Sequence, residues 1–171
     1  MSADQTNTIT VRAACWPQDL QAARFLLRRY AEFLIHNPAG AVNICLTGYE
    51  EELAALPERY AEPEAVLLLG FLGDKAVGCV AVKQRRDRPG DCEMKRLWTE
   101  PAARGTGIGK ALIEAALAWS LQQGARTLLL DTVAEAMPDA VRLYRRMGFE
   151  ETERHNANPV SGLLFMKREL L

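Results

Sequence analysis

A short turn with three glycines constrains this chain more than any other stretch. It reads Arg104-Gly105-Thr106-Gly107-Ile108-Gly109-Lys110, after a strand-like run at 92–99 and at the start of an amphipathic helix that reaches 123. The first N–H groups of a helix have no intrahelical partner, and glycine lets a ligand come close to them. The helix dipole adds about 0.3 to 1 kcal/mol for a nearby anion. Because Arg104 and Lys110 add positive charge, the turn predicts a phosphate or pyrophosphate site.

The patterns around this turn predict a mixed α/β fold. Strand-like alternation occurs at 9–13, 65–72, 75–84, 92–99 and 127–130, and again after Phe149. Helical spacing occurs from Pro17 to 36, over 48–60, over 108–123 and over 138–147. The alternation of the strand at 92–99 breaks near Lys95 to Leu97, which predicts a β-bulge. Since no repeat or compositional break divides the chain, a single domain over 1–171 is expected.

Composition excludes several classes of partner and site. The formal net charge of −1 provides no field that favours nucleic acid or an anionic membrane. No apolar stretch reaches 18 residues and no leader pattern opens the chain, so a cytoplasmic protein is expected. The basic turn at 84–91 reads as a solvated loop. No metal site is expected, because the candidate ligands are widely separated: they are Cys15, Cys45, Cys79, Cys92, His36 and His155.

The turn does not fit the two common nucleotide-binding motifs. A Walker A loop requires glycine where Arg104 stands and a hydroxyl residue where Ala111 stands. A dinucleotide fingerprint requires G-x-G-x-x-G, whereas Gly105 and Gly107 are followed by Lys110 at the third glycine position. A nucleotide-binding protein is therefore the third-ranked hypothesis.

The motif that does fit is R-x-x-G-x-G, formed by Arg104, Gly107 and Gly109. With it the chain resembles the GNAT N-acetyltransferase superfamily, in which this motif holds the pyrophosphate of acetyl-CoA. Residues 140–149, AVRLYRRMGF, match a second segment of that family, A-x-x-L-Y-x-x-x-G-F. The resemblance implies a mostly antiparallel central sheet with a splayed, bulged strand, flanked by helices. It also implies transfer of acetyl from acetyl-CoA to the amine of a small molecule or peptide by direct attack, and it allows a homodimer.

The resemblance further assigns the residues that bind the cofactor. The backbone of Leu97, Trp98 and Thr99 would pair with the pantetheine arm as an added strand. The residues assigned to the pyrophosphate are Arg104, Gly105, Thr106, Gly107, Ile108, Gly109 and Lys110. Many family members carry an asparagine that contacts the pantetheine three residues before the alanine of the second segment. This chain has Met137 there.

Two residues are candidates for catalysis. Deprotonating an amine with a lysine-like pKa of about 10.4 costs roughly 4.6 kcal/mol at pH 7, so a base is useful. Glu93 stands where several family members carry the catalytic glutamate, and the alternative is a cross-strand ion pair. Tyr144 matches the family's tyrosine that protonates the departing CoA thiolate or hydrogen-bonds its sulfur. The resemblance therefore also assigns Tyr144 to the residues that contact the cofactor. The alternative is a tyrosine of the core.

Two questions stay open at this point. A CoA-binding sensor or interaction protein that has lost catalysis would show the same motifs, because a fold does not guarantee activity. The acceptor is not encoded in any recognisable motif. Residues 36–48 and 154–162 are predicted to shape its pocket.

Overall fold

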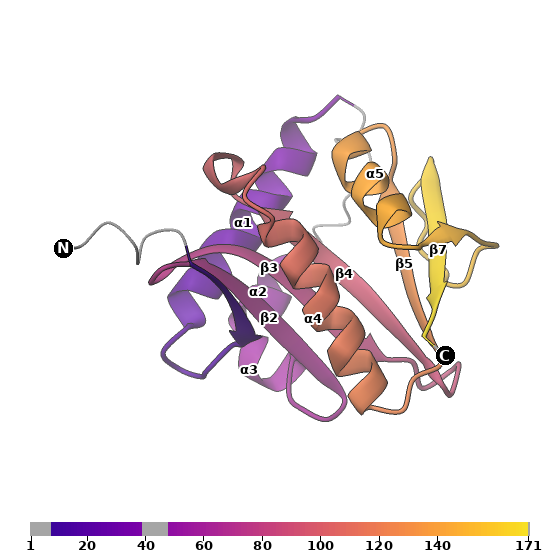
Figure 1. The fold of residues 1–171 in the computed structure, drawn as a ribbon, viewed down its shortest axis with the longest axis horizontal. Helices are drawn as coiled ribbons and strands as arrows, with labels where there is room; N and C mark the ends of the chain where they lie inside the picture. The colour runs from indigo at the N-terminus through magenta and orange to yellow at the C-terminus, as the bar shows by residue number, and fades with distance from the viewer. Residues whose placement is uncertain (1–7, 39–47, 171) are drawn as a thin grey trace.

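The computed structural model describes residues 8–38 and 48–170 and shows one seven-stranded sheet with helices on both faces (Figure 1). The strands are β1 (Ile9–Ala13), β2 (Ala65–Leu72), β3 (Lys75–Gln84), β4 (Asp91–Thr99), β5 (Thr127–Val133), β6 (Glu150–Glu151) and β7 (Leu163–Glu169). The helices are α1 (Leu20–His36), α2 (Tyr49–Ala54), α3 (Leu56–Arg59), α4 (Ile108–Gln122) and α5 (Pro138–Arg146), with a 3-10 turn at Pro101–Ala103. The strand order is β1-β2-β3-β4-β5-β7-β6, and only the β4–β5 pair is parallel. The predicted mixed, mostly antiparallel α/β sheet is confirmed.

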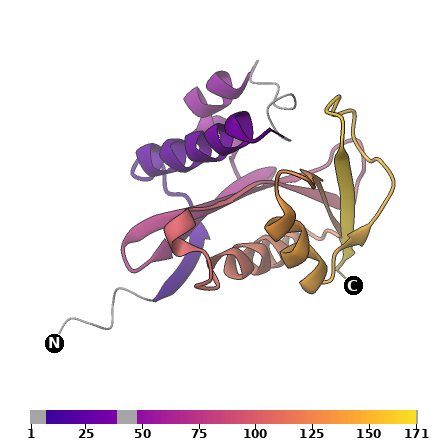
Figure 2. The ribbon, with the colours of Figure 1, turned by 90° about the horizontal axis from the view of Figure 1, so that it is seen from above.

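The sheet separates two apolar cores. Helices α1 to α3 cover one face, and α4 and α5 cover the other (Figure 2). The core under α4 and α5 contains Val80, Met94, Leu112, Leu128 and Tyr144 among its buried residues. The core under α1 to α3 contains Leu27, Leu53, Leu69, Cys79 and Trp98. Both faces are therefore apolar, which explains why the middle strands read as nearly continuous hydrophobic runs.

The sheet splits between β4 and β5. These two strands pair only from Asp91 to Glu93 on β4, opposite Thr127 to Leu129 on β5. Beyond this point the strands diverge, while β4 continues to pair with β3. The register of β3 and β4 shifts between the Ala81–Lys95 and Cys79–Trp98 pairs, which confirms the predicted bulge. Within it, Arg96 has a φ of 61°, a conformation that is uncommon for a non-glycine residue.

Two helix predictions need correction. The first helix begins at Leu20 rather than Pro17, because Asp19 occupies its N-cap and is held there by Arg12 Nη1 at 2.6 Å and the Cys15 amide at 2.7 Å. The helix predicted over 48–60 is two helices that break at Ala55. Pro57 has no N–H to donate to the carbonyl four residues earlier. That carbonyl, of Leu53, accepts from Arg24 Nε at 2.8 Å instead.

Other expectations concern single residues and the membrane. Cys79 and Cys92 are buried, as their apolar strand patterns predict. Most of the segment 36–48, which is predicted to shape the acceptor pocket, lies outside the described residues, as does Cys45. Across residues 8–38 and 48–170, no helix combines the length and the apolar character needed to cross a membrane.

Candidate functional site

The glycine turn leads into helix α4, whose N-terminus has no side-chain cap among the described residues. Gly105 and Gly107 adopt φ values of 82° and 95°, which glycine tolerates without a Cβ clash. Gly107 is the N-cap of α4, and no side chain of the described residues caps that end. The first intrahelical bond runs from the Ala111 amide to the Gly107 carbonyl, 3.0 Å apart. The amides before Ala111 in the first turn therefore remain available to an anion.

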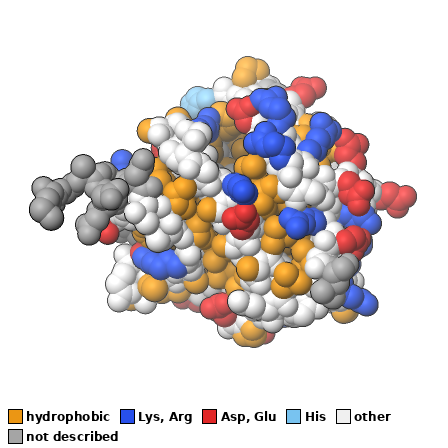
Figure 3. Space-filling view, in the orientation of Figure 1, with side chains coloured by type: hydrophobic (Ala, Val, Ile, Leu, Met, Phe, Trp, Pro, Cys, Tyr) orange, Lys and Arg blue, Asp and Glu red, His pale blue; other side chains and the backbone are white. Residues whose placement is uncertain are grey.

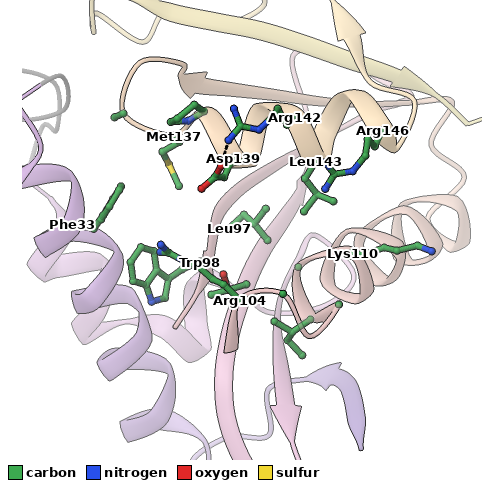
Figure 4. A pocket seen from close by; sticks show the side chains of 18 residues that line it. Phe33, Leu97, Trp98, Arg104, Lys110, Met137, Asp139, Arg142, Leu143 and Arg146 are labelled. Carbon is green, nitrogen blue, oxygen red and sulfur yellow. Dashed lines mark hydrogen bonds and ion pairs between the residues drawn. The ribbon is translucent and has the colours of Figure 1, made fainter. Parts of the chain in front are cut away.

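A cavity of about 580 Å³ opens above these amides, between the N-terminus of α4, the diverging part of β4 and helix α5 (Figure 4). This volume is typical of a small-molecule or cofactor site. Figure 3 shows the molecular surface hollowed on this face, with Lys and Arg side chains along the rim. The lining residues are Phe33, Leu97, Trp98, Thr99, Arg104, Gly105, Gly107, Ile108, Gly109, Lys110, Ala136, Met137, Pro138, Asp139, Ala140, Arg142, Leu143 and Arg146.

The cavity brings together most of the residues predicted to bind the cofactor. The stretch Leu97 to Thr99 and the glycine turn line the same space. Two predicted residues do not line it. Thr106 turns its hydroxyl back to the Ala103 carbonyl at 2.6 Å, which braces the turn. Tyr144 lies in the core behind Leu143.

The cavity has an apolar end and a basic end (Figure 4). Phe33, Trp98 and Met137 lie at one end, while Lys110 and Arg146 lie at the other. Arg104 lines the cavity, but its guanidinium stacks over the Trp98 ring, 5.1 Å from the centroid. Aromatic stacking leaves its planar N–H groups free at their edges.

Helix α5 contributes a wall that sequence reasoning did not assign. Arg142 and Arg146 are one turn apart on this helix and both line the cavity, and that four-residue spacing was the available signal. Arg142 pairs with Asp139, and Arg145 pairs with Glu151 outside the cavity. Arg146 has no carboxylate partner in the described part of the chain. α5 can approach α4 closely because Gly109 lacks a side chain: a Cβ there would lie 3.1 Å from Leu143 Cδ2.

The edge of β4 that faces the cavity has no strand beside it. β4 pairs with β3 on both sides of the bulge, from Cys92 to Thr99, whereas its pairing with β5 ends at Glu93. Around Leu97 the free edge therefore presents backbone groups that an extended ligand can use as a strand would.

Tyr144 lies in the core under α4 and α5 and does not line the cavity. Its ring packs 5.8 Å from that of Phe149, and the residue is 5% exposed. Burial raises the pKa of its hydroxyl, and Tyr30 and the negative charge of Asp131 raise it further. Tyr144 thus remains protonated at neutral pH. The two groups that raise the Tyr144 pKa beyond the effect of burial are Tyr30 on α1 and Asp131 on β5.

Glu93 occupies a different setting from Tyr144. Its carboxylate is buried and lies 2.7 Å from Arg85 Nη1, 3.6 Å from Lys95 Nζ and 3.9 Å from Lys83 Nζ. It does not line the cavity. Arg85 corrects the prediction of a plain solvated turn, because its side chain is only 8% exposed and also donates to the His155 carbonyl at 2.9 Å.

The uncapped start of α4 lies beside the split between β4 and β5, and the cavity continues along the free edge of β4. This arrangement is suited to an extended ligand that carries phosphate. Residues 40–149 match the Acetyltransferase (GNAT) family. An uncharacterised N-acetyltransferase of Schizosaccharomyces pombe is 32% identical over 165 residues, which cover 96% of each chain. An aminoglycoside N(6′)-acetyltransferase of Stenotrophomonas maltophilia is 31% identical, over 61% of this chain and 72% of its own length.

Solved structures of GNAT-family acetyltransferases have the same fold as this chain. A GNAT-family acetyltransferase of Staphylococcus aureus superposes with a TM-score of 0.75 at 15% identity, covering 96% of this chain and 100% of its own. The PaiA N-acetyltransferase of Thermoplasma acidophilum, solved with coenzyme A, has a TM-score of 0.72 at 14% identity, covering 95% and 99%. The chain belongs to the GNAT family of acetyltransferases and is an N-acetyltransferase.

Proposed function

We propose that this enzyme transfers the acetyl group of acetyl-CoA to the amine of a small molecule or peptide. The observation that supports this most directly is the uncapped start of α4, which opens into a cavity bordered by the free edge of β4. A diphosphate on the first-turn amides and a pantetheine along β4 would use both features at once.

The two ends of the cavity give this ligand a direction. The amides from Gly107 to Lys110 would hold the pyrophosphate, and the backbone around Leu97 would hold the pantetheine arm. The 3′-phosphate of CoA then lies at the basic end, beside Lys110 and Arg146. Bound acetyl-CoA supplies the activated thioester. The chain's own residues hold that thioester where β4 and β5 part.

Tyr144 is proposed as the group that assists the departing sulfur. The amine nitrogen attacks the carbonyl carbon, the C–N bond forms, the C–S bond breaks, and the amine loses one proton to solvent. The Tyr144 hydroxyl, which is protonated at neutral pH, transfers its proton to the thiolate sulfur and regains a proton from water. A positioned acid of this kind contributes about 10² to 10⁴ in rate.

For Glu93 we propose an ion-pair role, which its contacts support. A base must come within hydrogen-bond reach of the amine, directly or through one water. The Glu93 carboxylate is buried and lies against three cations. These contacts support the ion-pair role, and water then serves as the proton acceptor.

The proposal is tested by binding and turnover measured separately. Calorimetry is expected to show acetyl-CoA binding, and the bound ligand should raise Tm by mass action. Release of CoA thiol is then followed across amines, amino acids and peptides. Binding with no thiol release from any acceptor would indicate a CoA sensor. The absence of binding at millimolar acetyl-CoA would refute the proposal itself.

A further inference from the structure

The cavity draws its lining from both faces of the sheet. Gly107 and Lys110 belong to the start of α4 on one face, whereas Phe33 belongs to α1 on the other. Trp98, whose ring centroid is 5.4 Å from that of Phe33, is part of the core under α1 to α3. The phosphate site and the edge of β4 are assigned to CoA. The apolar end, which faces α1, is therefore the part of the cavity left for the acceptor.

The apolar end offers a packing surface rather than polar contacts. The side chains of Phe33 and Met137 point towards it and are half-buried, so part of each is available to a ligand (Figure 4). The one polar atom of the Trp98 ring, Nε1, already donates to Glu100 Oε1 at 3.3 Å. Apolar ligand surface gains free energy on burial against such side chains. A charged group placed there would lose hydration without gaining a partner.

The charged side chains that line the cavity are mainly cations. They are Arg104, Lys110, Arg142 and Arg146, against one carboxylate, Asp139, which pairs with Arg142. The Arg104 guanidinium lies over both rings of the apolar end, 5.1 Å from the centroid of Trp98 and 5.9 Å from that of Phe33. A second ammonium on the acceptor would thus meet a guanidinium there and no unpaired carboxylate among the described lining residues.

The acidic residue that contacts this aromatic wall is already used. Glu100 accepts from Arg29 Nε at 3.2 Å as well as from Trp98, and its side chain is 16% exposed. The two segments predicted to shape the acceptor pocket, 36–48 and 154–162, contain neither Asp nor Glu. A polycationic acceptor would therefore lack the carboxylates that recognise such ligands.

We propose that the acceptor is an apolar monoamine: a primary amine on an alkyl or arylalkyl body that carries no second positive charge, packed against Phe33 and Met137. The assignment rests on the proposed acetyl transfer and deepens it by naming the substrate class. The C–N bond forms, the C–S bond breaks, the amine gives up one proton and CoA leaves as its thiol. Phe33 and Met137 determine specificity and take no part in the chemistry.

The test compares two amines that differ only at the end remote from the reacting nitrogen, hexylamine and hexamethylenediamine. Thiol release is measured at saturating acetyl-CoA. Hexylamine is expected to exceed the diamine by about tenfold or more in kcat/KM per amino group, because the second ammonium is desolvated without a partner. From propylamine to hexylamine, kcat/KM should rise by about fourfold for each methylene that becomes buried. Equal or higher values for the diamine would overturn the assignment, and so would a flat series.

Calorimetry with acetyl-CoA and a wider acceptor panel separate this assignment from the proposed function. If the protein binds acetyl-CoA and acetylates spermidine, amino acids or peptides but not the alkyl monoamines, the acceptor class is wrong and acetyl transfer stands. If it binds acetyl-CoA and acetylates no amine, or does not bind acetyl-CoA, both are overturned.

A charge placed in the apolar end tests the contact itself. Phe33→Glu replaces an apolar surface by a carboxylate beside Arg104, so the ratio of hexylamine to hexamethylenediamine in kcat/KM should fall by about tenfold or more. Met137→Glu should shift the ratio in the same direction, which keeps the test available if the first variant does not fold. Binding of acetyl-CoA by calorimetry shows that each variant is folded.

The matched control is Phe25→Glu, which introduces the same charge on α1 about two turns before Phe33. The Phe25 side chain is 55% exposed and does not line the cavity. This variant should keep the ratio of the parent. If Phe33→Glu and Met137→Glu bound acetyl-CoA and kept the parent ratio as well, the acceptor body would not lie at the apolar end and the assignment would be wrong.

Discussion

The two halves of β4 differ in what surrounds them. From Asp91 to Glu93 the strand has a neighbour on each side, and the Glu93 carboxylate is met by three cations. From Leu97 to Thr99 it has β3 on one side and the cavity on the other, and its backbone is bulged just before this stretch, at Arg96. The first half therefore fixes β4 in the sheet, whereas the second half has a free edge that borders the cavity.

The largest effect is expected on the free energy of unfolding, when the ion pairs of Glu93 in the first half of β4 are removed. Glu93→Ala leaves the buried Arg85 guanidinium without its buried partner, which should lower the free energy of unfolding by about 3 kcal/mol. Urea denaturation measures this. Asp87→Asn removes the exposed partner of the same guanidinium and should cost less, because water screens that pair.

The same position tests the ion-pair role against the base role. Glu93→Gln keeps the shape of the side chain and removes its charge. If Glu93 has only the ion-pair role, the pH profile of kcat/KM should keep its form while stability falls. If the pH profile of kcat/KM lost its acidic limb while stability stayed unchanged, Glu93 would be the base. The two halves of β4 could then no longer be assigned separate structural and binding roles.

The next effect concerns the anion site opposite the free half. Gly107→Val places a β-branched side chain at positive φ, where the first-turn amides must approach a phosphate. Loss of these charge-assisted bonds, about 1.5 to 3 kcal/mol each, predicts at least about a hundredfold weaker acetyl-CoA binding by calorimetry.

The same helix offers a matched control for the backbone strain. Gly124 follows the C-terminus of α4, has a φ of 77°, and has open space around it. Gly124→Val should lower Tm to a similar degree and leave acetyl-CoA affinity unchanged. Equal losses of affinity in both variants would mean that strain, rather than access to the amides, explains the result.

The Tyr144→Phe variant tests whether the Tyr144 hydroxyl acts as the proposed acid. The change removes one hydroxyl from a buried ring and should lower kcat by about a hundredfold, since the departing sulfur loses its donor. Affinity for acetyl-CoA should stay within about twofold, because Tyr144 does not line the cavity. Unchanged turnover would return Tyr144 to the core.

Sequence alone predicted those features whose causes are local. The glycine turn, the bulge near Arg96 and the ends of β2 and β3 follow from residue spacing and turn chemistry, and the structure confirms them. The burial of Arg85 could not be predicted, because its partners are a strand residue eight positions away and a carbonyl 70 positions away. Phe33 reaches the cavity only because α1 packs against β4. Contacts of this kind depend on the assembled sheet.

The smallest expected effect tests which end of the cavity holds the 3′-phosphate of CoA. Arg146 lines the basic end without a carboxylate partner among the described residues, whereas its neighbour Arg145 pairs with Glu151 outside the cavity. Arg146→Ala should weaken binding of CoA by about tenfold, which corresponds to 1.4 kcal/mol, and leave 3′-dephospho-CoA unaffected. Arg145→Ala should change neither affinity. Equal weakening of CoA and dephospho-CoA by Arg146→Ala would instead place its guanidinium on the diphosphate, so that the ligand would lie further along β4 than proposed.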